Sequence, residues 1–193
     1  MRSFVAVPLP DAAREALTRA GATIRAGSRE WAGERWVAPQ NLHITLAFLG
    51  DVPESDLAEL DGPLSRACAG IEPFSLVLDS VIAVPGPRRA SMLWSVPARP
   101  SEVCAALAGS VRDAVLPFSE RSDARPFTAH VTLVRARRPL ECPATALSGA
   151  ERILAGDATS MLVSVRDVIL CSSTLTPRGP IYETISRTCL GVA

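Results

Sequence analysis

The chain contains no lysine, because all twenty of its basic residues are arginine. This absence excludes Schiff-base chemistry on a lysine and the lysine of a Walker-type phosphate-binding loop. There is also no excess of charge of either sign, since twenty acidic residues balance the arginines. Proteins that grip long nucleic acids usually carry a broad basic excess. Any nucleic-acid role should therefore involve a short segment or an end, held in a pocket.

Paired cysteines and long apolar runs are missing as well. The five cysteines are odd in number, widely spaced and free of any CxxC pair, so we expect reduced thiols and neither a disulfide framework nor a structural zinc site. Residues 1–8 are too short and too soon broken by proline for a signal peptide, and no apolar run approaches the roughly 20 residues of a membrane span. These features predict a cytoplasmic protein without membrane contact, and we expect it to be a monomer.

The length and the pattern of elements predict the fold class. A chain of 193 residues fits one domain, or two small lobes that share a core. The predicted strands cover residues 3–9, 34–37, 41–49, 74–84, 92–96, 127–135, 161–172 and 181–188. The predicted helices cover residues 11–26, 53–67, 101–115 and 144–155. Because short turns join several strands, the pattern favours an α+β fold of antiparallel sheets over a doubly wound parallel sheet.

The two histidines of the chain occur in the same four-residue pattern, His-x-Thr-Leu, at residues 43–46 and 130–133. Side chains alternate between the two faces of a strand, so the histidine and the threonine of each motif share one face. A predicted helix precedes each motif strand, and the motifs lie about half a chain apart. We therefore expect a single domain of two pseudo-symmetric lobes, with one motif on each lobe and outer helices around a central cleft.

The four polar side chains of these motifs suit in-line displacement at phosphorus. Of His43 and His130, a neutral imidazole takes a proton from the nucleophile and a protonated one gives a proton to the leaving oxygen. Both forms exist near neutral pH because the ordinary pKa of histidine is about 6.5. The hydroxyls of Thr45 and Thr132 can donate to the non-bridging phosphate oxygens. This chemistry needs no metal and no other cofactor.

Other interpretations of the two histidines are weaker. A lone histidine on a half-buried strand is most often a satisfied structural residue, but two in identical frames, with none elsewhere, favour a function. A metal site needs a third or fourth ligand, and the sequence contains no HxH or HExxH pattern. Catalysis by a serine or cysteine nucleophile lacks the support of a GxSxG elbow.

Stretches outside the motifs add to the evidence that the two histidines have a function. Together with the motifs, residues 2–7, 35–50, 87–94, 125–127 and 173–182 resemble the 2H phosphoesterase superfamily, in the same order along the chain. Within this superfamily the chain resembles the bacterial and archaeal 2′-5′ RNA ligase-like family, also described as RNA 2′,3′-cyclic phosphodiesterases. The sequence departs from the family at Ala129, where a proline commonly precedes the second histidine.

The resemblance implies an activity and roles for the motif residues. It implies hydrolysis of a 2′,3′-cyclic phosphate at an RNA end to a 2′-phosphate, and, in some members, joining of RNA ends through a 2′-5′ linkage. His43 would be the general acid for the leaving 3′-oxygen and His130 the base that activates water, with Thr45 and Thr132 on the phosphate oxygens. Because the two motifs are near copies, the residues themselves leave the acid and base roles interchangeable.

Further substrate contacts are predicted from position. Arg125 can reach a phosphate, and Phe48, Trp36 and Tyr182 can stack on a base. Trp94 is a further candidate for stacking, and the arginine run at residues 135–138 can guide an RNA strand. Two alternatives stay open: a phosphodiesterase that acts on a small cyclic nucleotide or a 2′-5′ oligonucleotide, and a non-catalytic module that binds RNA ends.

Overall fold

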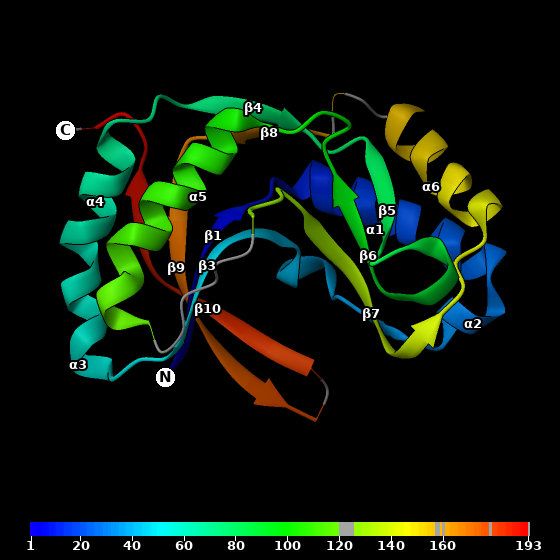
Figure 1. Cartoon of the computed structure of the whole chain (residues 1–193), viewed down its shortest axis with the longest axis horizontal. Helices are drawn as coiled ribbons and strands as arrows, with labels where there is room; N and C mark the ends of the chain where they lie inside the picture. The colour runs from blue at the N-terminus through cyan, green and yellow to red at the C-terminus, as the bar shows by residue number, and fades with distance from the viewer. Residues whose placement is uncertain (120–125, 157–158, 160, 178, 193) are drawn as a thin grey trace.

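The computed structural model describes residues 1–119, 126–156, 159, 161–177 and 179–192 (Figure 1). Its main sheet has eight antiparallel strands in the order β10-β9-β1-β3-β7-β6-β5, and β2 pairs with β7 beside this path. The strands of this sheet are β1 (Arg2–Pro8), β2 (Arg35–Trp36), β3 (His43–Asp51), β5 (Ser80–Val84), β6 (Ala90–Val96), β7 (Val131–Leu140), β9 (Asp167–Thr176) and β10 (Gly179–Cys189). The helices are α1 (Asp11–Gly27), α2 (Arg29–Ala32), α3 (Glu54–Leu57), α4 (Asp61–Ala69), α5 (Glu102–Val115) and α6 (Ala144–Gly156). The predicted α+β class with antiparallel strands is confirmed.

The two motif strands lie side by side at the centre of the sheet. β3 pairs with β7 through Ile44 and Val131, and this pairing joins the half β10-β9-β1-β3 to the half β7-β6-β5. In each half a further strand flanks the motif strand, β1 beside β3 and β6 beside β7. The halves are thus related by a pseudo-two-fold arrangement, as the repeated motif predicts.

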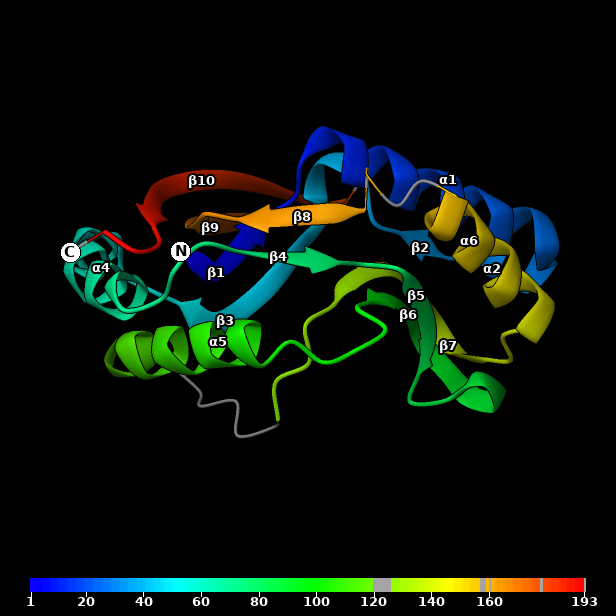
Figure 2. The same ribbon diagram turned by 90° about the horizontal axis from the view of Figure 1, so that it is seen from above.

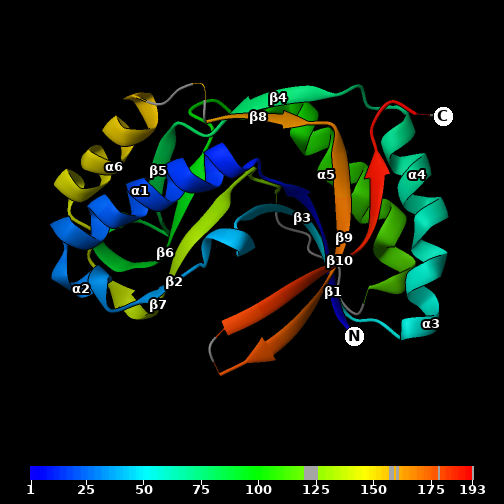
Figure 3. The same cartoon turned by 180° about the vertical axis from the view of Figure 1, so that it is seen from behind.

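The helices pack on different halves of the sheet (Figures 1 and 2). Helix α5 packs on β3 and on α4, whereas α1 packs on α6, which in turn contacts β5. Seen from behind in Figure 3, α1 lies in front of the β5–β7 half. Helix α1 therefore precedes β3 in the chain but covers the other half, and α5 precedes β7 but covers the half that contains β3. We propose that the chain is one domain of two lobes, which exchange these helices.

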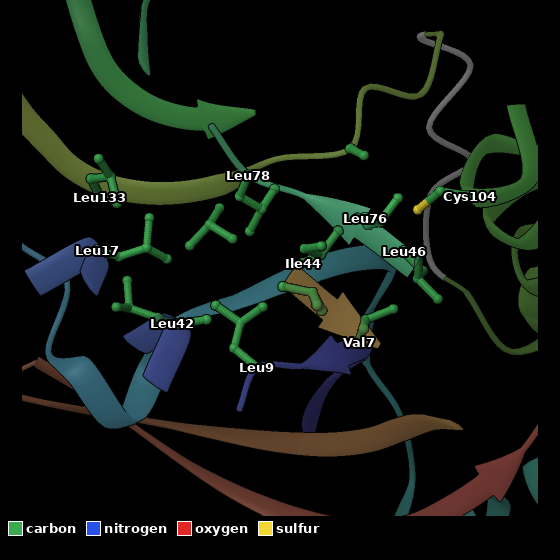
Figure 4. Close-up of a cluster of buried hydrophobic side chains, with 14 of the residues drawn as sticks. Val7, Leu9, Leu17, Leu42, Ile44, Leu46, Leu76, Leu78, Cys104 and Leu133 are labelled. Carbon is green, nitrogen blue, oxygen red and sulfur yellow. The ribbon is translucent and has the colours of Figure 1, made fainter. Parts of the chain in front are cut away.

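One hydrophobic core runs through both halves. Figure 4 shows Ile44 of β3, Leu133 of β7, Leu17 of α1 and Cys104 of α5 within the same buried cluster. Helix α1 enters this core because its small and aliphatic residues recur at helical spacing and form one buried face. The burial of residues from both halves in one cluster fixes how the motif strands lie relative to each other.

Two predicted strands are each divided in the structure. Instead of one strand over residues 74–84, β4 (Phe74–Val77) ends before Leu78 and β5 begins at Ser80. Likewise residues 161–172 divide into β8 (Leu162–Val165) and β9. β4 and β8 pair with each other in a separate two-stranded sheet, and the Asp79 carboxylate between β4 and β5 accepts the Ala98 N–H at 2.7 Å. Polar residues stand at both breaks, Asp79 at the first and Arg166 at the second, and each division is marked by a change of pairing partner.

All five cysteines are free thiols, and four of them are buried. Within the described part of the chain, no helix is both long and apolar enough to cross a membrane.

The contact between Gly21 of α1 and Trp36 makes a stability prediction. A Cβ on Gly21 would lie 2.8 Å from Cζ3 of Trp36, whose Nε1 donates to the Trp31 carbonyl at 2.9 Å and whose ring lies under the Arg25 guanidinium. The overpacking exceeds the gain in helix propensity, so Gly21→Ala should lower the free energy of unfolding by about 1–2 kcal/mol in urea denaturation.

The matched control is Gly109→Ala in the middle of α5, where a Cβ meets no atom within 4 Å. Here alanine should raise the free energy of unfolding by roughly 0.5–1 kcal/mol, because only the helix-propensity gain remains. Equal shifts of the same sign in the two variants would contradict the proposed packing of Trp36 on Gly21.

Candidate active site

The register of the motif strands gathers the four predicted polar side chains on one face of the sheet. Ile44 and Val131 are paired across β3 and β7 and are fully buried, so the residues on either side of them point to the opposite face. Continuing that antiparallel register places each threonine across from the histidine of the other strand. The two histidines take the diagonal positions, which in a regular ladder are roughly 7–8 Å apart between backbones.

Both imidazoles are oriented by the backbone just before their strands. His43 Nδ1 lies 2.8 Å from the Asn41 carbonyl oxygen, and His130 Nδ1 lies 2.7 Å from that of Thr128. A carbonyl only accepts, so Nδ1 carries the proton in both rings and Nε2 is left as the reactive nitrogen. His43 Nε2 lies 2.9 Å from Oγ1 of Thr45.

An aromatic ring from the neighbouring strand supports each imidazole. His43 stacks on Phe4 of β1, with ring centroids 4.8 Å apart, and the ring of Tyr182 meets it edge-on at 5.4 Å. His130 stacks on Trp94 of β6 at 3.8 Å, with the ring planes inclined by only 20°. These contacts restrict the rotation of both histidines, so that Nε2 of each ring stays in place.

The sequence does not predict Phe4 as a site residue, and it predicts a different role for Trp94. Phe4 lies in the first predicted strand without any motif of its own, so its contact with His43 depends on the pairing of β1 with β3. Trp94 is predicted only as a candidate for base stacking, whereas the structure places its ring against His130. Its indole Nε1 is buried and has no acceptor within the described part of the chain, so it remains available as a donor.

Burial weakens the basicity of both histidines. Desolvation lowers the pKa of His43 to about 4, opposed by its hydrogen bond to Asn41 and reinforced by the charges of His130 and Arg135. The pKa of His130 is also lowered, first by burial and then by Arg135. Since the charge of His130 acts on His43, the two imidazoles lie within electrostatic reach. Without a ligand, both rings are therefore mainly neutral at pH 7.

A bulge in each motif strand brings one more residue to the histidine face. In β3, Thr45 pairs with Ala6 of β1, but the next pair joins Ala47 to Val5, so the register shifts by one residue. Phe48 follows with an exposed side chain. In β7 the register with β6 shifts in the same place relative to the motif, between Thr132 and Val134, and Arg135 follows. The extra residue of a bulge reverses the later alternation. Phe48 and Arg135 thus occupy equivalent positions, three residues after the motif threonines.

A groove of about 410 Å³ opens over this face. It is lined by Thr45, Thr132, His130, Phe48 and Arg135 and by residues of α5 and of 126–128. His43 does not line the groove itself but lies next to it, against Thr45. The volume suits a ligand of about the size of one nucleotide.

Of the remaining residues predicted to contact the substrate, Tyr182 lies beside His43 and Trp36 does not. Tyr182 contacts His43, and the Asn41 side chain donates to the Pro180 carbonyl at 2.7 Å, which links β10 to the first motif. Arg125 lies outside the described residues. The expectation for Trp36 is wrong, because its register partner is the buried Val134, so its ring points to the opposite face and packs on α1.

The described residues also bear on the metal alternative. Among residues 1–119, 126–156, 159, 161–177 and 179–192, no group of three or more histidine, cysteine or acidic side chains is placed to hold a metal ion.

The chain is similar to known proteins over most of its length. The family described as LigT like Phosphoesterase matches residues 7–94. A protein of Archaeoglobus fulgidus named RNA 2′,3′-cyclic phosphodiesterase is 34% identical over 183 residues, with 95% of this chain and 97% of the relative covered. A protein of the same name from Methanothermobacter thermautotrophicus is 30% identical, with 94% and 95% covered.

Solved structures share the fold over nearly their whole length. The protein TT0787 of Thermus thermophilus superimposes with a TM-score of 0.76 at 26% identity, with 100% of this chain and 99% of that chain covered. E. coli LigT complexed with 3′-AMP gives 0.73 at 25% identity, with 98% and 97% covered. With relatives this similar over almost the full chain, the protein belongs to the LigT-like phosphoesterases of the 2H superfamily.

Proposed function

We propose that this protein hydrolyses 2′,3′-cyclic phosphate ends of RNA to 2′-phosphates by acid–base catalysis between His43 and His130, without a metal ion. The observation that carries the proposal is the orientation of the two imidazoles. Each donates from Nδ1 to a backbone carbonyl and directs Nε2 to the same face, where Nε2 of His43 accepts from the Thr45 hydroxyl without substrate. The names of the curated relatives and the 3′-AMP complex of E. coli LigT support a substrate of this kind.

The groups around the histidines suit a cyclic phosphate. The hydroxyls of Thr45 and Thr132 donate to its non-bridging oxygens, and Arg135 adds a positive charge that already acts on both imidazoles. The nucleoside occupies the groove, where the ring of Phe48, 54% exposed, offers a surface for the base. Bringing the phosphate anion between the imidazoles raises their pKa values and favours the protonation that the reaction needs.

The reaction transfers two protons in opposite directions. A neutral imidazole takes a proton at Nε2 from a water molecule as the water oxygen bonds to phosphorus. The bond from phosphorus to O3′ breaks, and the protonated imidazole gives its Nε2 proton to that oxygen. The product carries the phosphate on O2′. Joining of RNA ends through a 2′-5′ linkage would use the same two groups with an RNA hydroxyl in place of water.

Two observations bear on which histidine is the acid and which is the base. The family resemblance assigns the acid to His43, whereas burial makes a neutral His43 favourable before the substrate binds. The assignment to His43 therefore requires the bound phosphate to raise the pKa of His43 above that of His130. The assignment of the acid to His43 thus rests on the family resemblance alone.

Removing either imidazole should abolish useful turnover. His43→Ala and His130→Ala should each lower kcat on a nucleoside 2′,3′-cyclic phosphate by roughly 100- to 10,000-fold, the usual contribution of a general acid or base. Urea denaturation checks that the variants fold, and EDTA should leave the wild-type rate unchanged. Full activity in either variant would contradict the proposal, and labelled cyclic-phosphate RNA that stays bound and unchanged would indicate a binding module instead.

A sulfur leaving group separates the two roles. In an analogue with sulfur in place of O3′, the thiolate leaves without protonation, so the general acid is no longer needed. His43→Ala should then recover most of its activity relative to wild type, while His130→Ala stays impaired. Recovery in His130→Ala alone would reverse the assignment, and recovery in neither would argue against a proton-donating imidazole.

The lowered pKa values predict the pH profile of kcat/KM. Activity requires one neutral and one protonated imidazole, so it falls when the base is protonated at low pH and when the acid loses its proton at high pH. Because both pKa values lie below 6.5, that of His43 at about 4, the maximum should lie on the acidic side of 6.5. A profile that is flat from about pH 5 to 8 would contradict this electrostatic description.

A further inference from the structure

Three arginines from two distant parts of the sequence lie on the histidine face of the sheet. Arg35 of β2 is the direct register partner of Arg135 of β7, so both side chains point to the same face. Arg137 shares that face because Ala136, between the two, packs against the core. We call these three residues the arginine strip.

The strip carries a local positive charge that the protein itself only partly neutralises. Arg137 donates to the Gly33 carbonyl at 2.7 Å and lies 3.9 Å from the Glu34 carboxylate. Within the described part of the chain, Arg135 donates to the sulfur of Met92 at 2.9 Å, and Arg35 has no hydrogen-bond or ion-pair partner. Like charges directly opposite each other on paired strands destabilise a sheet. Two facing arginines in a chain of zero net charge therefore favour an anionic ligand between them.

The strip is continuous with the groove over the histidines. Arg135 lines that groove together with His130 and Thr132, and Arg137 lies farther along the same strand. At about 3.3 Å per strand residue, the distance from His130 to Arg137 is roughly 23 Å, which exceeds the length of one nucleotide. An anion that begins at the cyclic phosphate and follows the strip must therefore be a chain of several charged units.

Beside the strip lies an apolar surface suited to nucleobases. Trp94 and Met92 of β6 point to the histidine face, since their register partners on β7 are Thr132 and Arg135. Ile82 of β5 is the partner of Trp94 and is 38% exposed. Charge beside aromatic and aliphatic side chains is the combination that binds single-stranded RNA on sheet surfaces.

We propose that the arginine strip binds the backbone phosphates of the RNA nucleotides that precede the cyclic end, so that the preferred substrate is an RNA oligonucleotide rather than a free cyclic nucleotide. This inference rests on the proposed function, because the groove must hold the terminal phosphate. Arg35, about a hundred residues from Arg135 in the sequence, thereby acts in substrate binding and not in the chemical step.

Binding measurements on two ligands test the strip. The probes are a fluorescent RNA hexanucleotide with a 2′-phosphate end and adenosine 2′-phosphate, which lacks the preceding phosphates. Arg35→Gln and Arg137→Gln should each weaken hexanucleotide binding about 5- to 10-fold and reduce the slope of log K against log salt by about 0.7, the value for one phosphate contact to a single strand. Binding of adenosine 2′-phosphate should change less than two-fold.

Arg152→Gln is the matched control, because Arg152 is an exposed arginine on α6, which covers the opposite face of the sheet. It should leave both affinities and the salt slope unchanged. Equal wild-type affinity for the two ligands would contradict the proposed role of the arginine strip. So would an equal loss of affinity for both ligands in Arg35→Gln. Hydrolysis of a hexanucleotide with a cyclic-phosphate end is measured separately. If the arginine variants weaken binding but the wild type does not hydrolyse this RNA, only the proposed function is contradicted. If the RNA is hydrolysed but the arginine variants bind it as well as the wild type does, only the role of the arginine strip is contradicted.

Discussion

The pairing of Ile44 with Val131 is the contact on which the site depends. It is the point where β3 meets β7, and it joins the two halves of the sheet. Both residues are fully buried, so their neighbours in each motif must point the other way. A slip of one residue in this register would turn the histidine of one strand into the core. The apolar residue inside each His-x-Thr motif is therefore as necessary to the site as the polar ones.

The exchanged helices stabilise that register. Helix α5 packs on β3, and α1 packs on α6, which contacts β5, so each half of the sheet is covered by the helix that precedes the other motif strand. Separating the halves would expose a core that runs through both. The hydrophobic effect thus stabilises the position of the two motif strands relative to each other, in addition to each half of the sheet.

The same burial that fixes the site also tunes its chemistry. Stacking on Phe4 and Trp94 withdraws the imidazoles from water and lowers their pKa values, while the Asn41 and Thr128 carbonyls hold the tautomer that leaves Nε2 free. A site arranged in this way is poorly protonated until an anion enters it. In the proposed function, the substrate phosphate supplies the charge that protonates one imidazole of the pair, and Arg135 balances the negative charge that remains.

The sequence by itself determined the motif residues and the fold class. Alternation along a strand requires His43 and Thr45 to share a face, and this local rule holds whatever the rest of the chain does. Only the tertiary structure decided which other side chains join them. Two bulges turned Phe48 and Arg135 toward the histidines. The pairing of β2 with β7 placed Trp36 on the core face and Arg35 beside Arg135. The order of the strands placed Phe4 and Trp94 against the imidazoles. Register, bulges and strand neighbours depend on contacts between residues far apart in the chain, and periodicity within a single strand contains no information about them.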